Sequence, residues 1–248
     1  MGGQSGSDPA GEGALRELVA AAGQVLHHQG LTDYLGHCSA RVPGTDRVVI
    51  KPKHSPTVRS PSGLGAADMI VIDLDGTLVE GGDPPPSERF IHTEIYRARP
   101  DVSAVVHTHQ QWGTLLGVIG AELLPVLHVP AVLADGGSIA TWPCPLLVQT
   151  PELGRALATA LGGGRLCHLQ GHGIVSVAGD LRLAVIAAIA VEQLAAANLA
   201  ILSTGRRPRV IAPGELAELA GSVAAIDGRW AYYLELARQA AGPARPRP

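Results

Sequence analysis

Two histidines stand one residue apart at the end of an apolar run, His107 and His109 in AVVHTHQQW at residues 104–112. Alternate side chains of a strand point to the same face, so both imidazoles can reach one metal ion while Thr108 points away. A second interpretation stays open on this spacing alone, because histidines at a strand end are also typical of solvated or hydrogen-bonded side chains. A metal site needs further ligands elsewhere in the chain.

Two other residues could complete such a site. His172 lies between Gly171 and Gly173, which permit a tight turn, although such a turn taken alone is more often structural. Glu88 follows Ser87, a candidate N-cap, in the first turn of a predicted helix, where a carboxylate also interacts favourably with the helix dipole. Three imidazoles and a carboxylate suit one Zn²⁺ or Mn²⁺ ion per chain, or Fe²⁺, acting as a Lewis acid.

The remaining histidines have weaker claims. His92 lies one helical turn from Glu88, and we interpret it as a packing or supporting residue rather than a ligand. His54 has no partner at a useful spacing, but it belongs to KPKHSPTVRSPSGLG at residues 51–65, a predicted irregular loop over a site or the surface.

The elements that must position these residues alternate between helices and strands. The last helix before the C-terminal region, at 180–203, is the most apolar segment, and polar residues within it favour a buried core helix over a membrane span. The alternation predicts an α/β layered domain around a central sheet. We expect helices at 14–29, 87–98, 110–118, 151–161, 180–203, 211–223 and 229–241, and strands at 47–52, 69–81 with an Asp75-Gly76 turn, 101–109, 145–150 and 165–170.

Length, charge and composition restrict the function classes. The 248 residues carry a formal net charge of −3 and only 3% aromatic residues, which argues against a nucleic-acid partner. Three widely spaced cysteines fit neither a disulfide framework nor a paired metal motif and favour a cytoplasmic protein. No membrane partner is expected. We predict a disordered segment at 1–13, one metal-binding domain at 14–241 and a frayed tail at 242–248.

Taken together, SERFIHTEIYRARPDVSAVVHTH and the later GHG at 171–173 resemble the class II aldolase/adducin family, over roughly residues 14–204. The resemblance implies a single three-layer domain with a largely antiparallel central sheet between helices. It also implies a metal site formed by Glu88, His107, His109 and His172, and a homo-oligomer, expected to be a tetramer.

The chain departs from the sugar-phosphate aldolases of that family where they bind phosphate. Their Gly-Asn-x-Ser, Thr-Pro-x-Gly and Ser-Ser motifs read GHCSAR, KPKHSP and PPSE here, so His37 replaces the asparagine and only Ser87 of the serine pair remains. The GHxS version resembles the branch with the pyridine-dicarboxylate decarboxylase. We expect a substrate carboxylate to be bound there in place of phosphate. The candidate substrate-binding residues are His37, Ser39, Arg41, Lys51, His54 and Ser87, with Lys53 and Arg59 as further cations.

The expected function is that of a metal-dependent carbon–carbon lyase. Decarboxylation of a non-phosphorylated hydroxy(aryl) carboxylic acid, through a metal-stabilised enolate, is the first hypothesis, with Glu88 as ligand, proton-transfer group or both. Aldol cleavage of a hydroxy-carbonyl or sugar-phosphate substrate is the alternative. A non-haem iron oxygenase and a non-catalytic adducin-like module are further alternatives, and the partner in the catalytic cases is a small-molecule carboxylate or hydroxy-carbonyl compound.

Overall fold

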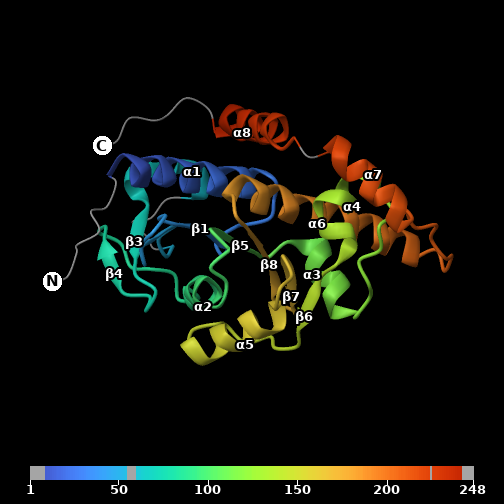
Figure 1. Cartoon of the computed structure of the whole chain (residues 1–248), viewed down its shortest axis with the longest axis horizontal. Coiled ribbons are helices and arrows are strands. Elements are labelled where there is room, and N and C mark those ends of the chain that lie inside the picture. Colours follow the sequence, from blue (N-terminus) through green and yellow to red (C-terminus); the bar gives the residue numbers. More distant parts are fainter. Residues whose placement is uncertain (1–8, 55–59, 224, 242–248) are drawn as a thin grey trace.

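A computed structural model describes residues 9–54, 60–223 and 225–241, and its centre is one eight-stranded sheet (Figure 1). The strands lie in the order β4-β3-β2-β1-β5-β8-β7-β6, and each neighbouring pair is antiparallel except β6 and β7. The expected α/β domain with a largely antiparallel sheet is confirmed. The strands are β1 (His37–Arg41), β2 (Val48–Ile50), β3 (Ile70–Ile72), β4 (Leu78–Glu80), β5 (Ala104–Thr108), β6 (Ala140–Trp142), β7 (Leu166–Leu169) and β8 (Gly173–Ala178).

Helices cover both faces of the sheet (Figure 1). Residues on β5 alternate between two buried cores: Ala104 and Val106 pack toward α1 and α6, whereas Val105 packs toward α2 and α5. His107 follows this alternation and therefore lies on the face of α2 and α5. The helices are α1 (Pro9–His28), α2 (Phe90–Ala98), α3 (Gln111–Val118), α4 (His128–Leu133), α5 (Pro151–Leu161), α6 (Leu181–Leu202), α7 (Pro213–Val223) and α8 (Asp227–Ala241), with 3₁₀ turns at Pro61–Gly63, Ala66–Asp68 and Asp135–Gly137.

Helix α1 ends where the sequence predicts but begins earlier. Gly30 has a φ of +71°, and the Leu31 amide donates to the Leu26 carbonyl at 2.9 Å, as in a Schellman motif. The helix starts at Pro9, so residues 9–13 are helical and the expectation of disorder there was wrong. An ion pair of 2.9 Å between Glu12 and Arg47 ties this first turn to the sheet. Residues 1–8 and the tail at 242–248 lie outside the described residues.

The prediction of a strand at 145–150 was also wrong, because this segment forms no strand. Pro143 and Pro145 have no N–H to donate to a neighbouring strand, and the amide of Val148 donates instead to Glu88 at 2.9 Å. The edge strand that pairs with β7 on the side away from β8 is β6, which lies earlier in the chain. Strands β1, β6 and β8 and helix α4 were not predicted. Polar residues on the buried faces of β1 obscure the apolar alternation by which strands are recognised.

Helix α6 is a core helix, as the sequence predicts. Its length and composition alone would allow it to cross a membrane, but 56% of its most apolar stretch is buried inside the protein. It packs against β5 and β8 and against α1, α3 and α4. This helix supports the strand that carries His107.

A histidine in this core gives a first prediction. His168 on β7 is 3% exposed, and burial lowers its pKa to about 4. The unfolded chain binds a proton below about 6.5, so the free energy of unfolding should fall as pH decreases from about 6.5 to about 4. We expect His168→Gln to remove up to about 1.4 kcal/mol per pH unit of this slope. Urea titrations at several pH values measure it, and equal slopes in the two proteins would contradict the prediction.

Candidate metal centre and substrate pocket

Segments that are distant in sequence meet at one end of the central strands. Strand β5 lies between β1 and β8 and is antiparallel to both, so its end meets the beginnings of its neighbours. The register places His107 opposite His37 of β1. His109 directly follows β5, His172 directly precedes β8, and Glu88 belongs to the turn before α2.

The four expected metal ligands are close together. One candidate ligand atom from each of Glu88, His107, His109 and His172 lies within 4.8 Å of all the others. The Nε2 atoms of His107 and His109 are 2.9 Å apart. The Glu88 carboxylate lies 3.5 Å from His172 Nε2 and 3.9 Å from His107 Nε2. This arrangement concentrates nitrogen and oxygen donors around one point.

The hydrogen bonds of these residues fit a bound divalent ion. His107 Nδ1 lies 3.0 Å from the Ile174 carbonyl oxygen, to which it must donate, so its Nε2 lone pair faces the cluster. Both ring nitrogens of His172 are buried and have no hydrogen-bond partner among the described residues. Buried polar atoms rarely lack a partner, and a bound metal ion would provide one for a ring nitrogen of His172. The donor set also matches the ligand preferences of Zn²⁺, Mn²⁺ and Fe²⁺.

The protonation states agree with this arrangement. Burial lowers the pKa values of His107 and His109, which keeps both imidazoles neutral. Burial raises the pKa of Glu88, but the nearby His172 ring and the hydrogen bond from the Val148 amide lower it, and the net pKa lies below the usual value. Neutral imidazoles and an ionised carboxylate are the forms that bind a metal ion.

Two glycines allow the close approach of these segments. A Cβ on Gly173 would lie 2.1 Å from the Thr108 carbonyl oxygen and 3.2 Å from His109 Cδ2, so no other residue fits there. Gly171 has a φ of +67°, the left-handed region that favours glycine. Glycine is therefore required on each side of His172 for a different reason, which is backbone conformation at Gly171 and close approach at Gly173.

The predicted location of Glu88 needs a correction. Ser87 and Glu88 lie in a turn before α2, whose first residue is Phe90, and Ser87 does not cap the helix. Glu88 was expected inside the first helical turn. Its carbonyl accepts from the Ile91 amide at 3.0 Å, so the turn leads directly into the helix.

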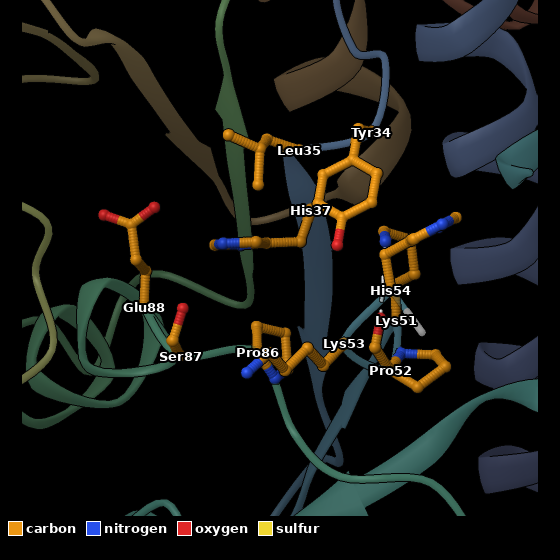
Figure 2. Close-up of a pocket in the computed structure, with 11 residues that line it drawn as sticks. Tyr34, Leu35, His37, Lys51, Pro52, Lys53, His54, Pro86, Ser87 and Glu88 are labelled. Atoms are coloured by element: carbon orange, nitrogen blue, oxygen red, sulfur yellow. Dashed lines mark hydrogen bonds between the residues drawn. The ribbon is translucent and has the colours of Figure 1, made fainter. Parts of the chain in front are cut away.

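A pocket that is partly open to solvent adjoins this cluster (Figure 2). Three segments line it, 34–37, 51–54 and 86–88. Figure 2 shows the His37 ring pointing across the pocket toward the side on which Glu88 lies. The rings of Tyr34 and His54 contact each other at a centroid distance of 4.2 Å.

Lys51 is the buried cation of this pocket. It is 6% exposed, and its Nζ donates only one hydrogen bond, 3.3 Å long, to the carbonyl of Pro52. No carboxylate within the described ranges forms an ion pair with it. Burial lowers its pKa. Lys53, by contrast, is exposed.

The other predicted substrate-binding residues divide into two groups. His37, His54 and Ser87 line the pocket together with Lys51. Ser39 is fully buried behind it, and Arg41 stacks on the Tyr96 ring at 4.8 Å and donates to the Tyr96 carbonyl, so neither lines the pocket. Arg59 lies outside the described residues.

The sequence matches the family described as Class II Aldolase and Adducin N-terminal domain over residues 17–199. This chain belongs to the class II aldolase and adducin family.

Relatives within this family include both decarboxylases and aldolases. A 3,4-dihydroxyphthalate decarboxylase from Arthrobacter keyseri is 33% identical over 93% of this chain and 96% of its own length. A 5-methylthioribulose-1-phosphate/5-deoxyribulose-1-phosphate aldolase from Rhodospirillum rubrum is 36% identical over 55% of this chain and 62% of its own. The structure of an aldolase II superfamily protein from Pseudomonas syringae has a TM-score of 0.80 at 23% identity, covering 95% of this chain and 96% of that one. It shares the fold.

In this class II aldolase-like site His92 was expected to be a packing or supporting residue, but the sequence did not identify its pairing with His37 or the role of Tyr96. His92 is fully buried, and its Nε2 lies 2.6 Å from His37 Nδ1. Its Nδ1 lies 2.6 Å from the hydroxyl of Ser39, which contacts the Tyr96 hydroxyl at 2.8 Å. The spacing of His92 from Glu88 identifies a common helix face, but nothing local indicates the pairing with His37.

Metal analysis tests the ligand set. We expect the purified protein to bind one Zn²⁺ or Mn²⁺ per chain, and His107→Ala or His109→Ala to reduce occupancy to below about a tenth, because each change removes an imidazole donor. His54→Ala is the matched control, since His54 lines the pocket outside the cluster. Elemental analysis after dialysis measures occupancy, and a full complement of metal in either cluster variant would refute the assignment.

Proposed function

We propose that this protein is a divalent-metal-dependent decarboxylase of a non-phosphorylated, hydroxylated aromatic carboxylic acid. The observation that carries the proposal is the position of the Glu88, His107, His109 and His172 cluster beside a pocket that contains the buried ammonium of Lys51. Such a site suits a substrate with anionic oxygen atoms at two places.

The unpaired Lys51 supports an anionic substrate. A buried ammonium without a carboxylate partner has lost hydration, and a bound carboxylate offsets that loss. A phosphate, by contrast, is usually bound by several converging backbone N–H and hydroxyl donors. Pro52 and Pro86 line the pocket and have no N–H to donate. A carboxylate therefore matches this pocket better than a phosphate does.

The family relationships favour the same substrate class. The 3,4-dihydroxyphthalate decarboxylase of Arthrobacter keyseri aligns with nearly the whole chain at 33% identity. Dihydroxyphthalate is a hydroxylated aromatic dicarboxylate, so it has the oxygen atoms that the pocket and the cluster would bind. We take hydroxylated benzene dicarboxylates as the first compounds to test.

The proposed reaction breaks the bond between a ring carbon and a carboxylate carbon. Carbon dioxide leaves, the electron pair remains on the ring carbon, and that carbon takes up one proton. A divalent ion held by the cluster would supply Lewis-acid polarisation of substrate oxygen atoms. Lys51 would orient the substrate through its carboxylate, and Glu88 has an oxygen available to accept a proton from a substrate hydroxyl. Leu35 and Pro86 provide apolar surface for the ring.

Aldol cleavage is the second candidate. The same four-residue cluster and the Rhodospirillum rubrum relative favour it. Both reactions leave an electron pair on carbon and need negative charge on oxygen to be stabilised. They differ in the fragment released, which is carbon dioxide in one case and an aldehyde in the other.

A substrate panel separates these functions. With Mn²⁺ or Zn²⁺ supplied, we expect carbon dioxide release from dihydroxyphthalates without oxygen consumption, and a specificity constant at least about 100-fold higher than for ribulose- or fuculose-type phosphates, since the pocket offers cations in place of a phosphate-binding turn. Carbon dioxide capture, an oxygen electrode and an aldehyde assay give the three readouts. Aldehyde release from a sugar phosphate as the preferred reaction would overturn the proposal.

Two lysines in one loop allow a matched test of carboxylate binding. We expect Lys51→Met to raise KM for a dihydroxyphthalate at least about 30-fold, because a buried charge pair is lost. Lys53→Met is the control and should change KM less than about threefold, since exposed pairs contribute little. Inhibition by phthalate should weaken in parallel. Equal effects of the two substitutions would argue against a special role for Lys51.

We also propose that the protein forms a homo-oligomer, with a tetramer as the expected state. Helix α3 presents an exposed apolar face consisting of Trp112, Leu115, Val118 and Ile119, and such faces are typical of subunit interfaces. Light scattering at micromolar concentration measures the mass in solution. A monomer under these conditions would contradict the proposal.

A further inference from the structure

Four buried side chains form one hydrogen-bonded chain behind the pocket. His37 Nδ1 lies 2.6 Å from His92 Nε2, His92 Nδ1 lies 2.6 Å from Ser39 Oγ, and Ser39 Oγ lies 2.8 Å from the Tyr96 hydroxyl. Strand β1 provides His37 and Ser39, and helix α2 provides His92 and Tyr96. Spacings of two on a strand and four on a helix place each pair on one face. This series of hydrogen bonds therefore joins strand β1 to helix α2.

Each contact in this chain holds one proton. A hydrogen bond between two ring nitrogens, or between a hydroxyl and a ring nitrogen, has one donor and one acceptor, and a neutral imidazole has one N–H group. In one arrangement Tyr96 donates to Ser39, Ser39 donates to His92, and His92 donates to His37. The proton of His37 is then on Nε2. In the reverse arrangement His37 donates to His92, His92 donates to Ser39, and Ser39 donates to Tyr96. The Nε2 atom of His37 then has a free lone pair.

The hydrogen-bond acceptor of the Tyr96 hydroxyl distinguishes these two arrangements. In the reverse arrangement the Tyr96 hydroxyl needs an acceptor other than Ser39, and the part of the chain that the structure describes offers none. A buried hydroxyl without an acceptor is costly, so the arrangement that begins at Tyr96 is favoured.

We propose that Tyr96, Ser39 and His92 hold His37 as the tautomer protonated on Nε2, so that His37 meets the substrate as a neutral hydrogen-bond donor. Nδ1 of His37 is engaged by His92, which leaves Nε2 as the nitrogen available to the pocket. Figure 2 shows the ring extending into that pocket. His37 is the residue that contacts substrate, and the other three are positioning residues.

The role toward substrate rests on the proposed function, whereas the tautomer does not. As the carbon–carbon bond breaks, negative charge grows on substrate oxygen atoms, and a donor already aimed at them stabilises it. A neutral imidazole performs this without giving up its proton. A lone pair at the same place would repel the charge. The direction of the hydrogen-bonded chain therefore decides whether His37 assists or opposes the reaction.

Nuclear magnetic resonance tests the tautomer without any turnover. Long-range proton–nitrogen spectra of the full-length, Zn²⁺-loaded protein with nitrogen-labelled histidine distinguish the two ring nitrogens, and His37→Gln identifies the His37 signals. We expect Nε2 to be protonated and Nδ1 to be unprotonated. A proton on Nδ1 would overturn the proposal even if the protein is a decarboxylase. The expected tautomer in a protein without decarboxylase activity would overturn only the proposed function.

Substitutions at His92 test the positioning role. His92→Leu removes the donor to His37, and we expect the tautomer preference to be lost and kcat to fall at least about tenfold, with KM changed less than about threefold. His92→Gln retains an amide that can donate to His37 and accept from Ser39, so it should recover most of kcat. His168→Gln, at a buried histidine outside the chain, should leave the His37 signals and kcat unchanged. Unchanged kcat and tautomer in His92→Leu would overturn the proposal, and the spectrum of the unsubstituted protein decides the matter if that variant does not fold.

Discussion

The antiparallel pairing of β5 with both β1 and β8 is the constraint on which the site depends. This pairing brings the end of one strand to the beginnings of two others and so collects residues from three parts of the chain. The contact is close because Gly173 leaves room for the Thr108 carbonyl. Beyond the strand, the Glu192 carboxylate of α6 accepts from the Trp112 and Gly113 amides at 2.9 Å each and caps α3. The segment with His107 and His109 is thus held at both ends.

Burial of many polar groups at this end of the sheet has two chemical consequences. Imidazoles that are removed from water resist protonation, so they remain available as metal ligands or as neutral hydrogen-bond donors. An ammonium that is removed from water attracts an anion, and Lys51 is buried without an ion pair to any carboxylate of the described residues. The same removal from water therefore acts on the candidate metal ligands and on Lys51. The apolar cores on both faces of the sheet offset the cost of these buried groups.

The proposed specificity depends on pocket residues that are separate from most of the candidate metal ligands. The metal cluster is held by strand ends and by the turn before α2, which are parts of the rigid framework. Most pocket residues come from the loop segments 34–36, 51–54 and 86–87, whereas His37 begins β1 and Glu88 belongs to the cluster itself. Loops tolerate substitution better than paired strands do, so a different substrate group can be bound without disturbing the metal ligands. This division is consistent with a family that contains both decarboxylases and aldolases.

The sequence by itself determined the features that depend on neighbouring residues. The spacing of His107 and His109 placed them on one side of the chain, the Gly30 cap and the Asp75-Gly76 turn were recognisable, and Glu88 and His172 followed from the family resemblance. Local sequence patterns did not predict contacts between residues that are distant in sequence. The apolar segment at 145–150 resembled a strand, but Pro145 and the hydrogen bond from the Val148 amide to Glu88 gave it another structure. His37 and His92 are 55 residues apart in sequence, and only the packing of α2 on β1 made them partners. Periodicity reports which face a residue occupies, whereas the pairing of strands and helices decides what that face meets.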